Sequence, residues 1–166
     1  MNNKYLLSIG SLVMTNCFIM WEYINGGVIT HHLLADETLP GLSNWWGLIT
    51  IPLVTFILLS WRDRNRSKEE SLIDGLHFFL AIIYGICLCI LWNTGNESIM
   101  PIVIFLPAVV SIWKPLSTIS FYLGLLFGMM HTFGGILPII AGIIIVMASF
   151  IAYHTLGRGL KLLTSG

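Results

Sequence analysis

Six apolar runs dominate this chain and constrain what it can fold into. A helix needs about 20 residues, at about 1.5 Å of rise each, to cross a bilayer. Segments in lipid must satisfy their own backbone hydrogen bonds, so such runs form helices. The runs lie at 5–24, 46–61, 75–92, 99–113, 117–133 and 136–156. The sequence therefore predicts an all-α, polytopic integral membrane bundle of six transmembrane helices, in a single domain covering residues 1–166.

The composition supports membrane residence and excludes some other classes. Hydrophobic residues make up 56% of the chain and charged residues 10%, against roughly 25% charged in an ordinary soluble domain. The lipid bilayer is therefore the first expected partner. Basic and acidic residues balance at eight each, and no basic patch predicts nucleic-acid binding. The three cysteines lie inside apolar runs, where a thiol behaves as a small hydrophobe. No motif identifies a cofactor.

The basic residues predict the orientation, because short loops rich in Lys and Arg stay in the cytoplasm. Six crossings that start inside put the N-terminus, the 62–74 linker, the 114–116 turn and the C-terminus on the cytoplasmic side. These four segments hold every basic residue, namely Lys4, Arg62, Arg64, Arg66, Lys68, Lys114, Arg158 and Lys161. We therefore expect an even number of crossings, cytoplasmic termini, and residence in a bacterial cytoplasmic (inner) membrane.

Proline and glycine mark the weakest points of these helices. The run at 99–113 is short and carries Pro101 and Pro107, and a proline inside a helix removes a backbone donor. The last two runs are separated only by Gly134 and Gly135. That pair suits a tight helical hairpin, and one long bent helix is the alternative.

The longest polar segment between two apolar runs is 25–47, which six crossings place on the outer side. Its 33–47 part alternates apolar and polar residues well enough to lie along the membrane interface. Ser43 or Asn44 would cap the second helix. This outer interfacial segment either closes the outer mouth of the bundle or acts as a lid over a cavity.

Candidate functional side chains gather in and around this segment. A carboxylate within a span, such as Glu22, is costly and is usually functional or paired. A carboxylate beside an imidazole would raise the pKa of the histidine. Three interpretations stay open: polar residues on a wet loop, a ligand-binding or proton-handling cluster, and a metal site for which His31, His32 and His131 are weak ligand candidates. The full set of ligand or proton-handling candidates is Glu22, His31, His32, Asp36, Asn44 and His131.

Small and polar residues indicate which helix faces pack. Helices in lipid associate through close backbone contact and polar side chains. Ser8, Ser11, Thr15 and Glu22 share one face of the first helix, which we expect to look into the bundle or into a water-filled cleft. Ser120, Gly124 and Gly128 form a packing face on the fifth, and the small residues of the 136–156 run offer a partner surface. The Gly124 and Gly128 face could alternatively bind a second copy or a larger membrane protein.

Three hypotheses about function follow from these patterns. The first is a small transporter, channel or ligand-binding bundle, with a path lined by the polar face of 5–24 and the glycine face of 117–133 and with Glu22 and His131 at its outer end. The second is a membrane-embedded enzyme that uses the His and Glu cluster on a lipid or a small apolar substrate. The third is an accessory subunit of a larger membrane complex. No serine hydrolase, P-loop or dinucleotide motif is present, so whether the chain is an enzyme stays open.

Overall fold

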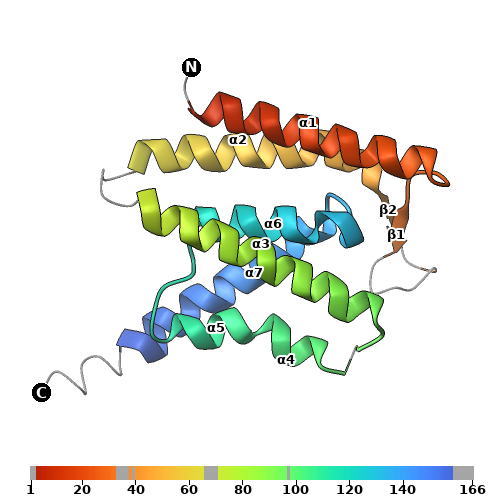
Figure 1. Cartoon of the computed structure of the whole chain (residues 1–166). Coiled ribbons are helices and arrows are strands. Elements are labelled where there is room, and N and C mark those ends of the chain that lie inside the picture. The colour runs from red at the N-terminus through yellow and green to blue at the C-terminus, as the bar shows by residue number, and fades with distance from the viewer. Residues whose placement is uncertain (1–2, 33–37, 39, 66–70, 97, 159–166) are drawn as a thin grey trace, which may run out of the picture. The chain divides into compact units, whose positions relative to one another are not determined.

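The computed structural model describes residues 3–32, 38, 40–65, 71–96 and 98–158, and most of them are helical. Two short strands, β1 (Thr30–His32) and β2 (Gly41–Ser43), precede a 3-10 turn at Asn44–Trp46. A π-helical turn at Tyr153–Gly157 ends the last helix. The helices are α1 (Asn3–Ile24), α2 (Gly47–Asn65), α3 (Ser71–Asn93), α4 (Met100–Ile104), α5 (Leu106–Ser111), α6 (Ile119–Phe133) and α7 (Leu137–Ala152) (Figure 1).

Four stretches of helix are long and apolar enough to cross a membrane. They are Lys4–Ile24, Asn44–Arg64, Asp74–Asn93 and Leu137–Gly157. This finding identifies the chain as a largely α-helical integral membrane protein. The other two predicted spans correspond to shorter apolar stretches, Met100–Ser111 and Ile119–Phe133. The longer of these has 15 residues, about 22 Å at the usual helical rise, so the count of six crossings stays a prediction.

The predicted span at 99–113 is two short helices, α4 and α5, that meet at Phe105. Pro107 explains the break, because it has no N–H to donate to the carbonyl of Val103 one turn earlier. The carbonyl of Val103 accepts instead from the backbone N–H of Phe105 and from the hydroxyl of Tyr84 in α3. This hydroxyl donates to the carbonyl oxygens of Val103 at 2.7 Å and Ile104 at 3.2 Å.

The predicted helical hairpin between the last two runs is confirmed. α6 ends at Phe133 and α7 begins at Leu137. Gly134 has φ +71°, a left-handed conformation that glycine adopts without steric cost.

The chain forms two compact units, which we describe separately. The first takes in Met1–Lys68 with Met130–Pro138, and the second Glu69–Met129 with Ile139–Gly166. In the first unit α1 and α2 run side by side (Figure 1). Ser11, Thr15 and Glu22 of α1 are buried, so the prediction that this face points into the protein is confirmed.

In the second unit the small-residue face of α6 lies against α3. A Cβ on Gly124 would be 2.9 Å from the Cβ of Ala81, and one on Gly128 would be 3.1 Å from the Cα of Gly85. Ser120 is also buried. The helix beside Gly124 and Gly128 is therefore α3, whereas the small residues of the 136–156 run had suggested that run as the partner surface. Binding of a second copy or a larger membrane protein through this face stays a prediction.

The segment between α1 and α2 contains strands that the sequence did not predict. β1 and β2 pair antiparallel, with His31 opposite Leu42 and His32 opposite Gly41. The backbone N–H and C=O groups of the two strands thus form hydrogen bonds with each other. The interfacial placement of 33–47 stays a prediction, and Asp36 lies outside the described residues.

Candidate functional site

The carboxylate of Glu22 is buried at the C-terminal end of α1. Only 3% of the residue is exposed, and Asn44, its closest partner, is 2% exposed. The Asn44 side-chain amide donates from Nδ2 to Oε1 of Glu22 at 2.7 Å, and the backbone N–H of Ile29 donates to Oε2 at 3.4 Å. A buried carboxylate needs such donors because its desolvation is costly.

The chain between α1 and α2 is shaped to bring these donors to Glu22. Gly26 and Gly27 have φ of 128° and 109°, values that L side chains rarely adopt, and they turn the chain back at the end of α1. The N–H of Asn44 then donates to the carbonyl of Ile29 at 3.0 Å. Ser43 caps the 3-10 turn by accepting from the N–H of Trp45. Sequence analysis proposed Ser43 or Asn44 as the cap, and the structure leaves Asn44 free to bind Glu22.

His31 is the third member of this arrangement, which we call the Glu22 site and define as Glu22, Asn44 and His31. The ring of His31 is half-buried, and its Nε2 atom is buried without a hydrogen-bond partner among the described residues. Burial lowers the pKa of His31 from 6.5, although the charge of Glu22 acts in the opposite direction. The carboxylate thus acts on the pKa of His31 in the expected direction, but the net shift is downward because desolvation is the larger effect.

His32 and His131 occupy different surroundings from His31. Successive side chains on a strand point to opposite faces, and the ring of His32 lies beside Gly41, with Cε1 3.1 Å from where a Cβ of that glycine would be. His131 is exposed at the end of α6. Its ring contacts those of Phe18 at 5.3 Å and Trp21 at 5.8 Å between centroids. The structure thus brings Glu22, Asn44 and His31 together. His131 lies apart from them, against the aromatic side chains of α1.

The turn between α6 and α7 packs directly onto the Glu22 site. A Cβ on Gly134 would overlap the side chain of Asn44 and lie 3.2 Å from Cδ2 of His31. A Cβ on Gly135 would lie 2.8 Å from the backbone nitrogen of Gly47. Only glycines let the turn approach so closely. Two consecutive glycines were visible in the sequence, but nothing in the pattern indicated that they would meet Asn44.

The polar face of α1 continues from Glu22 toward the N-terminus. Thr15 donates from Oγ1 to the carbonyl of Ser11 at 2.8 Å and lies 3.8 Å from the sulfur of Met130. Ser11 in turn donates to the carbonyl of Ser8 at 2.8 Å. Hydroxyl groups therefore follow the carboxylate along one buried side of the helix.

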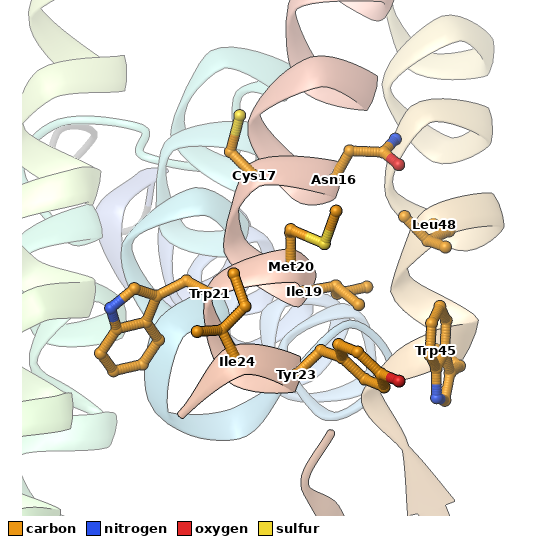
Figure 2. Close-up of a pocket in the computed structure, with 9 residues that line it drawn as sticks. All are labelled: Asn16, Cys17, Ile19, Met20, Trp21, Tyr23, Ile24, Trp45 and Leu48. Carbon is orange, nitrogen blue, oxygen red and sulfur yellow. The ribbon is translucent and has the colours of Figure 1, made fainter. Parts of the chain in front are cut away.

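A separate apolar groove lies between α1 and the start of α2 (Figure 2). Its volume is about 740 Å³. Glu22 does not line it, because the carboxylate belongs to the buried face of α1. The lining residues are Asn16, Cys17, Ile19, Met20, Trp21, Tyr23, Ile24, Trp45 and Leu48.

The chemistry available at the Glu22 site is the uptake and release of protons by a carboxylate and an imidazole. Within the described part of the chain, no three His, Cys, Asp or Glu side chains gather as they would around a metal ion. Comparison with models of known protein families, with curated proteins and with solved structures gives no match.

Proposed function

We propose that the protein is a small transporter or channel of a bacterial cytoplasmic membrane, in which Glu22 takes up and releases a proton at the outer end of a polar path. The observation that carries this proposal is the buried Glu22 carboxylate at the end of an apolar helix. Ionisable groups in such helices are costly to keep and commonly mark ion or proton pathways.

The surroundings of Glu22 favour proton exchange over a purely structural role. Asn44 and Ile29 offer two donors to the carboxylate, which would suffice to hold it in place. His31 adds an imidazole whose Nε2 is buried and unpartnered among the described residues. The hydroxyls of Thr15 and Ser11 continue the polar surface along α1. A carboxylate that only tied α1 to α2 would need neither feature.

The proposed arrangement in the membrane has six crossings and all basic residues inside. Contacts in the second unit support it. A Cβ on Gly157, at the end of α7, would lie 2.5 Å from the carbonyl oxygen of Ile112, so the chain just before Lys114 adjoins the chain just before Arg158. At the start of α6, Thr118 Oγ1 lies 3.5 Å from Nδ1 of His77 in the first turns of α3.

Proton flux into liposomes tests the function. The purified protein would be reconstituted with a trapped pH-sensitive dye, and a valinomycin-clamped potassium gradient would drive protons inward. We expect the wild type to acidify the lumen and Glu22→Gln to reduce the rate to that of empty liposomes, because the amide cannot carry the proton. Flux through Glu22→Gln at the wild-type rate would remove the carboxylate from the mechanism.

Asn16→Ala is the matched control for this experiment. Asn16 is an exposed polar residue of the same helix, and its side chain donates to the carbonyl of Leu12 at 2.9 Å. Its removal takes away a polar group without touching the Glu22 site, so flux should stay at the wild-type level. Circular dichroism and gel filtration in detergent would establish that both variants keep the helical fold.

A further inference from the structure

The hydroxyl groups of α1 and α2 fall into two sets. One set bonds to the carbonyl one turn earlier in its own helix, as Thr15 and Thr50 do at 2.8 and 2.9 Å. This is the usual way to satisfy a helical Ser or Thr. The other set does not: the hydroxyl oxygens of Ser8, Thr55 and Ser60 are buried and have no hydrogen-bond partner among the described residues.

The contacts between α1 and α2 show that the helices run antiparallel. Glu22, near the end of α1, bonds to Asn44 just before α2 begins. Near the other end of the pair, the rings of Tyr5 and Phe56 lie 5.8 Å apart. Residues that follow Tyr5 on α1 therefore face residues that precede Phe56 on α2.

This register puts Ser8 and Thr55 at the same level of the helix pair. A Cβ on Gly47 would lie 3.6 Å from Cγ2 of Thr15. Ser8 lies two turns before Thr15 and Thr55 lies two turns after Gly47, so the two hydroxyl residues come to nearly the same level. Thr55 is 2% exposed, so its unpartnered hydroxyl is buried. Ser60 and the buried, unpartnered Nε of Arg62 extend the same feature toward the end of α2.

Unpartnered hydroxyls at one level of a helix pair indicate a bound molecule that both donates and accepts hydrogen bonds. A buried hydroxyl without a partner is destabilising. A valine at such a position would have nearly the shape of threonine and would not carry that cost. Water is the smallest molecule that satisfies such groups, and it recurs wherever buried polar atoms lack protein partners. Hydroxyls and water together can pass a proton along a line of hydrogen bonds.

We infer that the α1–α2 interface binds a line of water at the level of Ser8 and Thr55, and that this line carries protons rather than metal cations between the Glu22 site and the inner side. The inference rests on the proposed function and names its substrate class. A metal cation would need several oxygen ligands to replace its hydration shell. The buried polar groups that α1 and α2 carry between Glu22 and Arg62 are the hydroxyls of Ser8, Ser11, Thr15, Thr55 and Ser60 among the described residues, and hydroxyls suit water better than a bare cation.

The test compares two identical substitutions in the same helix. Thr55→Val removes the unpartnered hydroxyl, and Thr50→Val removes one that bonds within its own helix. In the proteoliposome assay, Thr55→Val should slow proton uptake about tenfold, equivalent to one lost hydrogen bond in the barrier, while Thr50→Val should keep the wild-type rate. Flux of potassium or sodium, followed with dyes selective for each ion, should match that of empty liposomes for the wild type.

Each outcome supports or overturns the inference. Loss of flux in Glu22→Gln with wild-type flux in Thr55→Val would overturn the water line and leave the proposed function standing. Absence of proton flux in the wild type, or sodium or potassium flux above that of empty liposomes, would overturn the inference too.

Two further measurements guard against a folding artefact. Thr55→Ser keeps the hydroxyl and should restore most of the flux. If the hydroxyl is hydrated, Thr55→Val should leave the melting temperature unchanged or lower it. A Thr55→Val protein that melts at a higher temperature with unchanged flux would show that the hydroxyl is dry and would overturn the inference.

Discussion

The side-chain amide of Asn44 donates a 2.7 Å hydrogen bond to the buried carboxylate of Glu22. This bond joins the end of α1 to the start of α2, and both residues are almost inaccessible to solvent. If one of the two side chains is removed, bulk water cannot reach the other to replace the lost hydrogen bond. The pair should therefore contribute to stability through the cost of leaving a charge unpaired.

Asn44→Ala should lower the free energy of unfolding by about 2 kcal/mol, the usual loss when a hydrogen bond to a charged group is removed. Denaturant titration of the detergent-solubilised protein, followed by circular dichroism, would measure it. The same substitution in a Glu22→Gln background should cost less, because the remaining partner is neutral. Equal losses in the two backgrounds would mean that the bond is not the cause.

The lowered pKa of His31 predicts a stability that depends on pH. Because burial favours the neutral ring, the unfolded chain binds a proton below pH 6.5 that the folded chain does not bind. Stability should therefore fall as the pH drops below that value and should be insensitive to this group above it. Melting temperatures measured across this range should show the slope in the wild type.

His31→Gln should flatten the acid side of that profile relative to the wild type. In Glu22→Gln the acid end of the window should move to lower pH, since the charge of Glu22 acts to raise the pKa of His31 in the folded protein, while the upper end near pH 6.5 should stay where it is. An unchanged acid slope in His31→Gln would assign the effect to other groups.

Gly134 offers a test of how closely the α6–α7 turn packs on the Glu22 site. Gly134 and Gly95 have nearly the same φ, +71° and +70°, so alanine pays the same left-handed penalty of about 1 to 2 kcal/mol at either position. A Cβ at Gly95 meets nothing within 4 Å, whereas one at Gly134 overlaps Asn44. Gly134→Ala should therefore lower the unfolding free energy by about 1 to 3 kcal/mol more than Gly95→Ala, as overpacking does.

A similar loss in both alanine variants would argue against the close contact between the turn and Asn44. Proton flux gives a second readout, because a displaced Asn44 changes the hydrogen bonding of Glu22. We expect Gly134→Ala to reduce flux and Gly95→Ala to leave it unchanged.

Periodicity was enough to predict the buried polar face of α1, because Ser11, Thr15 and Glu22 recur at helical spacing. It also showed that Gly124 belongs to a packing face. Spacing does not say which helix fills the space beside a glycine, since any backbone of suitable shape can approach it. The choice of α3, through Ala81 and Gly85, depends on tertiary structure.

Three features of the Glu22 site were out of reach of the sequence. β1 and β2 have three residues each, too few for an alternating pattern to stand out. Glu22 and His31 were grouped with His131 by their depth in the predicted topology, but the sign of the pKa shift of His31 depends on how far the ring is buried, which the sequence does not encode locally. Asn44 was expected as a cap, and its bond to Glu22 requires the turn at Gly26 and Gly27.

The break between α4 and α5 predicts an interaction between Tyr84 and Pro107. Tyr84→Phe should lower the unfolding free energy by about 1 to 2 kcal/mol, because the carbonyls of Val103 and Ile104 lose the hydroxyl donor. In a Pro107→Ala background the new N–H can bond to the carbonyl of Val103, so Tyr84→Phe should cost less. Denaturant titration of the four proteins would give the coupling energy, and a coupling of zero would contradict this account.

Tyr122→Phe is the matched control for Tyr84→Phe. The hydroxyl of Tyr122 donates to the carbonyl of Ile139 inside α7 at 3.1 Å, a longer bond than the 2.7 Å bond from Tyr84 to Val103. The loss of stability should therefore be smaller than for Tyr84→Phe.

The position of Lys114 decides between six crossings and four. If only the four long helices cross, Lys114 lies outside while the other basic residues stay inside. If Met100–Ser111 and Ile119–Phe133 also cross, Lys114 lies inside with the rest. The approach of Gly157 to Ile112 favours the second arrangement, because Arg158 follows Gly157 at the end of a long helix and Lys114 follows Ile112 by two residues.

Labelling with a membrane-impermeant maleimide would settle this question in a variant that lacks the three native cysteines. We expect Lys114→Cys and Arg158→Cys to react only when the cytoplasmic side is open, because positive residues in short loops stay inside. Asn96→Cys, in the turn after α3, should react in intact cells and serves as the control for outer access. Labelling of Lys114→Cys in intact cells would leave four crossings and would put the α5–α6 connection outside. Such a result would keep Glu22 at its outer position, because α1 and α2 cross in both arrangements.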